Sequence, residues 1–202
     1  RKKYVKSSRD EKIAEIYEEY QKRLIANNSM DFEDLLLKPI HLFSSNEKIL
    51  HKYKSRFNFI LVDEFQDTNK AQYELLKMLV SRTCKISVVG DDAQSIYSWR
   101  GANIGNMTDF RKDFKNHKLF KLEQNYRSTK TILAAADSVI KNNKNQVSKT
   151  LWTQNNDGEQ LTLIRCADEK DEAFQLAKYI KKEISKKKLS YKDFAILYRT
   201  NA

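Results

Sequence analysis

Apolar residues recur every three or four positions in residues 1–56, the spacing that places them along one face of a helix. The pattern predicts one helix over residues 10–26. A second helix starts at Asp31 and ends or kinks near Pro39, because proline lacks the N–H that a helix interior uses. A third starts at Ser44, where a glutamate follows at the spacing of a capping box. The start of the chain is therefore predicted to be a helical segment.

From residue 57 onward the pattern changes, and residues 59–62 form a continuous apolar run that Asp63 and Glu64 follow at once. Such runs are typical of strands buried on both faces of a parallel sheet that helices cover. The predicted strands span 59–62, 86–89 and 118–122, and helices begin near Thr68 or Asn69 and at Ser128. This alternation predicts an α/β fold in which ligands bind at the carboxyl ends of the strands.

The alternation resumes after a polar, asparagine-rich stretch at 141–158, which is predicted to be a loop or linker. A strand over 160–165, a helix over 169–185 and a strand over 194–198 are expected there. The predicted fold class is thus α/β, with partial parallel sheets and flanking helices behind an N-terminal helical segment.

The charge balance is strongly basic, since 38 Lys and Arg against 27 Asp and Glu give a net charge of +11. Such an excess favours a polyanionic partner, nucleic acid before membrane, because each phosphate contact releases a counterion. Cys84 and Cys166 lack metal-ligand spacing and indicate reduced thiols, as in a cytoplasmic protein. With three histidines a zinc site is not expected. No signal peptide and no apolar run long enough to span a membrane are visible.

Two carboxylates, Asp63 and Glu64, directly follow the apolar run at 59–62. An NTPase needs one carboxylate to hold Mg²⁺ and often a second that positions or deprotonates the attacking water. Adjacent acids at a strand end meet both needs, because the turn lets both approach one ion. The spacing alone leaves open an ordinary pair of surface charges.

Gln94 follows the end of the second predicted strand, where its amide can hydrogen-bond a terminal phosphate or the attacking water. Tyr97, Trp99 and Arg100 come next and offer stacking surfaces for exposed bases, each typically contributing about 1–3 kcal/mol in single-strand binders. The alternative is a packed tryptophan beside an ordinary surface arginine.

Arg127 stands just ahead of a predicted helix, where an arginine can reach into a neighbouring nucleotide site. Tyr126 beside it can stack on a base. A helix-capping loop centred on Ser128 is compatible with both roles.

Taken together, three segments resemble motifs II, III and IV of the UvrD/Rep/PcrA-like superfamily 1 DNA helicases in sequence, order and separation. They are Val62–Asn69, Gly90–Ala102 and Leu122–Ser128. Residues 31–36 resemble the family's helical insert, and residues 195–202 resemble the start of its next motif. The resemblance covers essentially the whole chain.

The resemblance implies ATP and Mg²⁺ as cofactors. It places Asp63 and Glu64 at the metal, with Glu64 activating water. Gln94 and Arg127 would contact the γ-phosphate, and Tyr126 would stack on adenine. The implied DNA partners are single strands and their junctions with duplex, held by Tyr97, Trp99 and Arg100.

The resemblance also divides the chain into the end of the helical insert (1–56), the later half of a first RecA-like motor domain (57–121) and the beginning of a second (122–202). It implies ATP-driven 3′→5′ translocation on single-stranded DNA with duplex unwinding. No Gly-x-x-x-x-Gly-Lys-Ser/Thr loop, which cradles phosphates, occurs among the four glycines. The chain is therefore predicted to be an internal fragment that has no ATPase activity alone.

Two other interpretations remain open at this point. A helicase–nuclease subunit of the RecB/AddA kind shares these motifs. A non-catalytic single-strand binding module is the other alternative, although such a module needs neither the carboxylates nor Gln94 and Arg127. The sequence does not indicate a repair, replication or restart pathway, nor an oligomeric state.

Overall fold

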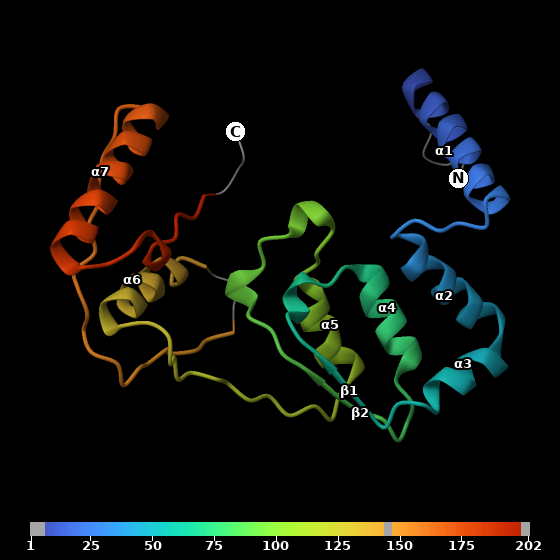
Figure 1. Cartoon of the computed structure of the whole chain (residues 1–202). Coiled ribbons are helices and arrows are strands. Elements are labelled where there is room, and N and C mark those ends of the chain that lie inside the picture. Colours follow the sequence, from blue (N-terminus) through green and yellow to red (C-terminus); the bar gives the residue numbers. More distant parts are fainter. Residues whose placement is uncertain (1–6, 144–146, 199–202) are drawn as a thin grey trace. The chain divides into compact units, whose positions relative to one another are not determined.

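The computed structural model describes residues 7–143 and 147–198, which form two compact units (Figure 1). The first unit holds the chain up to Leu122 together with Ile140–Lys149, and the second holds Glu123–Val139 and the chain from Thr150 onward. The end of the predicted motif at 195–202, from position 199, lies outside the described residues. No described helix is both long and apolar enough to cross a membrane.

Three helices open the chain, as the apolar spacing predicts: α1 (Ser8–Ala26), α2 (Asp34–Ser45) and α3 (Glu47–Lys54). The second helix was predicted to end or kink near Pro39, and the end is wrong, because α2 continues through this residue. Beyond Pro39, Phe43 is buried and its ring lies 5.3 Å from that of Tyr53 in α3. This packing holds the helix together past the hydrogen bond that proline cannot donate.

The caps of these helices also differ from the prediction. α2 begins three residues after Asp31, whose carboxylate accepts a hydrogen bond from the Asp34 N–H at 2.8 Å. α3 is capped by Asn46 and not by Ser44, whose hydroxyl donates back to a carbonyl within α2. Both Ser and Asn are good capping residues, so the choice between them depends on where the preceding helix ends.

A two-stranded parallel sheet forms the centre of the first unit. β1 (Phe59–Val62) and β2 (Lys85–Val88) pair in register, with Val62 opposite Val88, and α4 (Lys70–Leu79) connects them. Asn69 caps α4 in a capping box with Gln72, as one of the two predicted caps. Because the strands are parallel, both carboxyl ends lie at one edge of the sheet (Figure 1).

An aromatic cluster beneath that edge makes the core of the first unit. Phe65 is fully buried, and its ring meets Tyr73 of α4 and Phe110 of α5 (Gly105–Asp113) edge-on, at centroid distances of 5.7 and 5.6 Å. Edge-to-face aromatic pairs add to the stability that apolar burial provides. The residue after Glu64 is therefore anchored in the core.

Three predicted strands, at 118–122, 160–165 and 194–198, are wrong, because none of these segments pairs as a strand in the described structure. Phe120, Leu163 and Leu197 are 79%, 83% and 90% exposed. A strand needs a neighbour that offers backbone N–H and C=O groups, and an apolar run alone does not provide one. The fold class is nevertheless confirmed as mixed α/β with a parallel sheet and flanking helices.

The second unit contains α6 (Lys130–Ile140), α7 (Glu169–Lys187) and the 3₁₀ turn η5 (Tyr191–Asp193), so both predicted helices are present. A parallel bridge between Gln124 and Trp152 ties the loop before α6 to the segment that follows Lys149. Gly158 has a φ of 76°, and a Cβ there would lie 2.6 Å from the Thr129 methyl group. Position 158 therefore requires glycine.

Candidate functional site

β1 delivers two acidic side chains to the carboxyl edge of the sheet. Asp63 and Glu64 follow the strand directly, and both are exposed. Glu64 has a φ of 48°, in the left-handed region that residues with a side chain rarely adopt. The Asp63 carboxylate accepts a hydrogen bond from the Glu64 N–H at 2.9 Å, which supports this turn. Such backbone strain costs on the order of 1–3 kcal/mol and clusters at functional sites.

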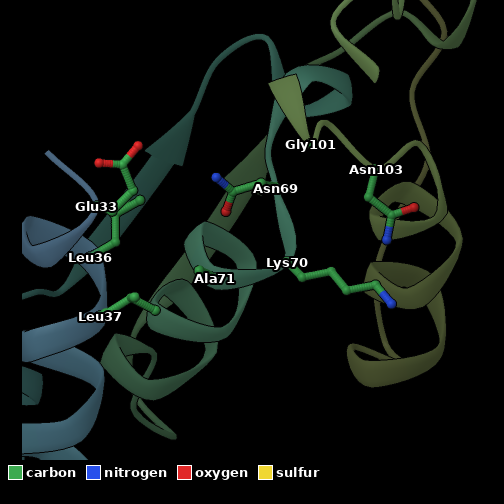
Figure 2. Close-up of a pocket in the computed structure, with 8 residues that line it drawn as sticks. All are labelled: Glu33, Leu36, Leu37, Asn69, Lys70, Ala71, Gly101 and Asn103. Atoms are coloured by element: carbon green, nitrogen blue, oxygen red, sulfur yellow. The ribbon is translucent and has the colours of Figure 1, made fainter. Parts of the chain in front are cut away.

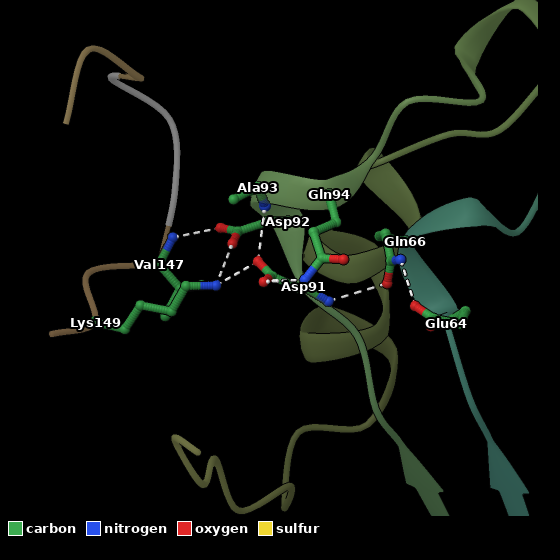
Figure 3. Close-up of polar contacts among 8 residues, drawn as sticks. All are labelled: Glu64, Gln66, Asp91, Asp92, Ala93, Gln94, Val147 and Lys149. Atoms are coloured by element: carbon green, nitrogen blue, oxygen red, sulfur yellow. Dashed lines mark hydrogen bonds and ion pairs between the residues drawn. The ribbon is translucent and has the colours of Figure 1, made fainter. Parts of the chain in front are cut away.

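The buried side chain of Gln66, in the 3₁₀ turn η2 (Phe65–Asp67), joins the ends of the two strands (Figure 3). Its Nε2 donates to Glu64 Oε2 at 2.8 Å, and its Oε1 accepts from the Asp91 N–H at 3.0 Å. One oxygen of the Glu64 carboxylate is thereby held, and the loop after β2 is held to the same amide.

Gly90 makes this close approach possible. A Cβ at this position would lie 2.7 Å from Gln66 Oε1 and 3.2 Å from the Gln66 backbone nitrogen. The first distance is shorter than Cβ atoms show and the second is unusually tight, so a larger residue at position 90 would displace the Gln66 side chain from this contact.

Gln94 lies in the next 3₁₀ turn, η3 (Asp92–Gln94), and is exposed. Its Nε2 donates to Asp91 Oδ2 at 2.8 Å. Partial burial alone would raise the pKa of the Asp91 carboxyl, but hydrogen bonds from Lys149, Gln94 and the Ala93 N–H together hold that pKa below its usual value. Asp91 is therefore a charged acceptor at neutral pH, and a charged acceptor forms the stronger hydrogen bond.

The carboxylates of Asp63 and Glu64 have the chemistry that Mg²⁺ requires. This ion is usually held by one or two carboxylates, with waters and substrate phosphates completing its shell. The described residues contain no cluster of three or more His, Cys, Asp or Glu that could enclose a metal, and such a cluster is not needed for an ion held in this way. The exposed pair at the strand end fits this donor set.

An exposed aromatic and cationic cluster, formed by Tyr97, Trp99 and Arg100, follows Gln94. Trp99 and Arg100 lie in the 3₁₀ turn η4 (Ser98–Arg100), and Trp99 is 66% exposed. The Arg100 guanidinium carbon lies 4.6 Å from the Trp99 ring centroid and 5.5 Å from that of Tyr97. Stacking of this kind orders the three side chains without burying them.

The remaining predicted site residues, Tyr126 and Arg127, belong to the second unit. The Tyr126 ring is 79% exposed, and its hydroxyl donates to Gln124 Oε1 at 2.8 Å. The Asn125 side-chain oxygen accepts from the N–H groups of Arg127 and Ser128, at 2.9 and 2.7 Å. This turn ahead of α6 leaves the Arg127 side chain exposed.

Comparison with known families identifies both parts of the chain. Residues 1–115 match the UvrD/REP helicase N-terminal domain, and residues 120–202 match the UvrD-like helicase C-terminal domain. The chain belongs to the UvrD/Rep helicase family. This confirms the resemblance that the three motifs indicate.

Curated members of the UvrD/Rep family are about half identical to this chain. The ATP-dependent DNA helicase PcrA of Leuconostoc citreum is 47% identical over 192 residues, covering 95% of this chain and 26% of that protein. DNA helicase II of Rickettsia typhi is 51% identical over 184 residues, covering 91% and 28%. PcrA of Staphylococcus aureus is 49% identical over 191 residues, covering 94% and 26%. The chain thus spans about a quarter of the length of these relatives.

A shallow hollow of about 390 Å³ lies between α2, α4 and the segment that follows η4 (Figure 2). None of the site residues that the UvrD/Rep resemblance implies lines it. Its walls are formed by Glu33, Leu36, Leu37, Asn69, Lys70, Ala71, Gly101 and Asn103.

The contacts that join the strand ends involve three residues to which the sequence assigned no site role: Gln66, Asp91 and Lys149. Asp91 lies two residues after the apolar end of the second predicted strand, a position similar to that of Asp63 after the first. Gln66 lies close to the carboxylates in sequence, but the sequence around it does not indicate that its side chain is buried. Lys149 pairs with a residue 58 positions away, so no local pattern indicates it.

Proposed function

We propose that this chain carries part of the motor of an ATP-dependent DNA helicase. The observation that supports this most strongly is the hydrogen-bonded network at the carboxyl edge of the sheet. It links Glu64 through Gln66 to the loop of Gln94, and the exposed aromatic cluster follows within six residues. A nucleotide site and a base-stacking surface on one continuous segment suit coupling of hydrolysis to movement on DNA.

In this proposal Glu64 orients the attacking water and accepts its proton. Gln66 holds Oε2 of its carboxylate, so Oε1 is the oxygen available to the water. Asp63 with Glu64 would hold the Mg²⁺ of the nucleotide, which supplies charge neutralisation at the phosphates. Gln94 keeps one N–H on Asp91, and its second N–H and its carbonyl remain for a phosphate oxygen and the water.

The family resemblance also assigns nucleotide contacts to two residues of the second unit. Arg127 carries a permanent positive charge for the γ-phosphate, and Tyr126 offers an exposed ring for the adenine. These roles follow from the family resemblance, as do the domain limits at 56 and 121, the 3′→5′ polarity and the preference for junctions. The proposed cytoplasmic location rests on the two cysteines. The relatives are named helicases, which does not favour a helicase–nuclease subunit or a binding module without a motor.

Binding of single-stranded DNA tests the aromatic cluster. In fluorescence anisotropy with labelled oligo-dT, Trp99→Ala is expected to weaken binding by about 1–3 kcal/mol, because it removes one stacking platform. Trp152→Ala, which changes the only other tryptophan of the sequence, is the matched control and should leave binding unchanged. If binding is salt-sensitive and the affinity of Trp99→Ala equals that of the parent, the net charge of +11 alone holds the DNA. That result would contradict the proposal.

Hydrolysis is tested in a chimera in which this chain replaces the 191 matching residues of S. aureus PcrA. The chimera contains the remaining three quarters of that relative. We expect it to hydrolyse ATP in a DNA-stimulated manner, while the 202-residue chain alone does not. A folded, DNA-binding chimera without ATP hydrolysis would contradict the proposed motor function.

A further inference from the structure

Lys149, the last residue of the first unit along the chain, contacts the loop after β2 (Figure 3). Its side chain is only 20% exposed, and its Nζ pairs with Asp91 Oδ1 and lies 3.6 Å from Asp92 Oδ1. The neighbouring Val147 N–H donates to Asp92 Oδ2 at 2.6 Å. Two adjacent carboxylates of the loop are thus bound by one short segment of chain.

The Asp91 carboxylate divides its two oxygens between different partners. Oδ1 accepts from Lys149 and from the Ala93 N–H at 3.0 Å, whereas Oδ2 accepts from Gln94 Nε2. Among the described residues, Asp91 is the hydrogen-bond partner of the Gln94 side chain. The Gln94 side chain is exposed, so its hydrogen bond to Asp91 is what holds its amide in one orientation. The orientation of the Asp91 carboxylate therefore decides where the Gln94 amide points.

We infer that Lys149 is a positioning residue for Gln94, acting through the carboxylate of Asp91. The inference rests on the proposed function only where it gives Gln94 a role toward the nucleotide. Lys149 fixes Oδ1, the carboxylate plane is then set, and Oδ2 presents its lone pairs to Gln94. The glutamine is thereby held with its carbonyl and second N–H available for the water and the phosphate.

Electrostatics explains why a cation is needed at this point. Asp91 and Asp92 are both partly buried, and Lys149 is the cation that the described residues pair with them. Without it the two negative charges repel each other and favour rotation of Asp91 toward solvent. The lowered pKa of Asp91 agrees with this pairing. An arginine can replace the charge, whereas a glutamine of similar length cannot.

The orientation of Gln94 is measurable in the 202-residue chain by NMR. The side-chain amide signals of Gln94 are assigned by their loss in Gln94→Met. We expect them to move to the position of solvent-exposed glutamines in Lys149→Gln, and to stay in place in Lys149→Arg. Lys112→Gln, which removes an exposed lysine paired with Asp109, is the matched control and should also leave them unchanged. Unchanged backbone signals from β1 and β2 show that the fold is intact.

The inference is overturned if Lys149→Gln leaves the Gln94 signals in place, or if Lys149→Arg displaces them as far as Lys149→Gln does. In the PcrA chimera, Lys149→Gln should lower kcat for ATP hydrolysis about tenfold with a nearly unchanged KM, because misplaced groups slow chemistry more than binding. Lys149→Arg should restore kcat. A shifted Gln94 signal together with full hydrolysis would uphold the positioning of Gln94 but refute its role in the proposed motor.

Discussion

Glu64→Gln should reduce the kcat of DNA-stimulated ATP hydrolysis in the chimera by about 10²–10⁴-fold, the usual contribution of a general base. The substituted amide still accepts the hydrogen bond that Gln66 donates to the Glu64 carboxylate, so the turn and the network are retained. It cannot accept a proton from water. Steady-state hydrolysis, with the KM for ATP and the affinity for oligo-dT measured in parallel, separates the chemical effect from binding.

Glu74→Gln is the matched control, because Glu74 is an exposed carboxylate of the same unit that pairs with Lys77. It should hydrolyse ATP at the parental rate. Hydrolysis by Glu64→Gln at that same rate would refute the role of Glu64 as the base. Loss of oligo-dT binding in this variant would point to a folding defect.

Phe65→Ala is expected to destabilise the chain by about 3–5 kcal/mol, as large-to-small changes in a packed core do. Phe65 has no exposed surface, and its ring contacts those of Tyr73 and Phe110 edge-on. The cavity would lie directly beneath the turn of Glu64. Urea unfolding followed by circular dichroism gives the free energy of unfolding.

Phe120→Ala provides the comparison, because Phe120 belongs to the same unit and is 79% exposed. Its free energy of unfolding should stay within about 0.5 kcal/mol of the parent. A large loss of unfolding free energy in Phe120→Ala would show that Phe120 is buried, as the predicted strand at 118–122 requires. A small loss in Phe65→Ala would mean that the aromatic cluster is not the core.

The sequence predicted those elements whose causes are local. The helical spacing before residue 56 predicts the three helices, and the apolar runs predict β1 and β2. The predicted burial of these strands on both faces is wrong for β1, because Phe59 and Leu61 are 57% and 63% exposed. Asn69 was one of two predicted caps for α4, and the structure selects it. In contrast, α2 continues past Pro39, because Phe43 packs against Tyr53 of α3. A contact with another helix is not visible in the local pattern around the proline.

Features that depend on distant partners could not be predicted. The apolar residues at 118–122 predict a strand, but strand pairing requires a neighbour that sequence periodicity cannot reveal. The acidic pair and Gln94 could be proposed from the sequence because they lie just after predicted strands. Lys149 was missed, because 58 residues separate it from Asp91 and only the folded chain brings them together.

Because Glu64 has a left-handed backbone conformation, the residue that folds best at position 64 differs from the residue that the proposed chemistry needs. Selection for folding favours glycine or asparagine there, since these residues adopt a positive φ at the lowest cost. Selection for chemistry favours a carboxylate on a side chain long enough to reach beyond the turn. In the proposed role of Glu64 as the base, stability has been given up for reactivity at position 64, and variants that fold better there should hydrolyse ATP more slowly.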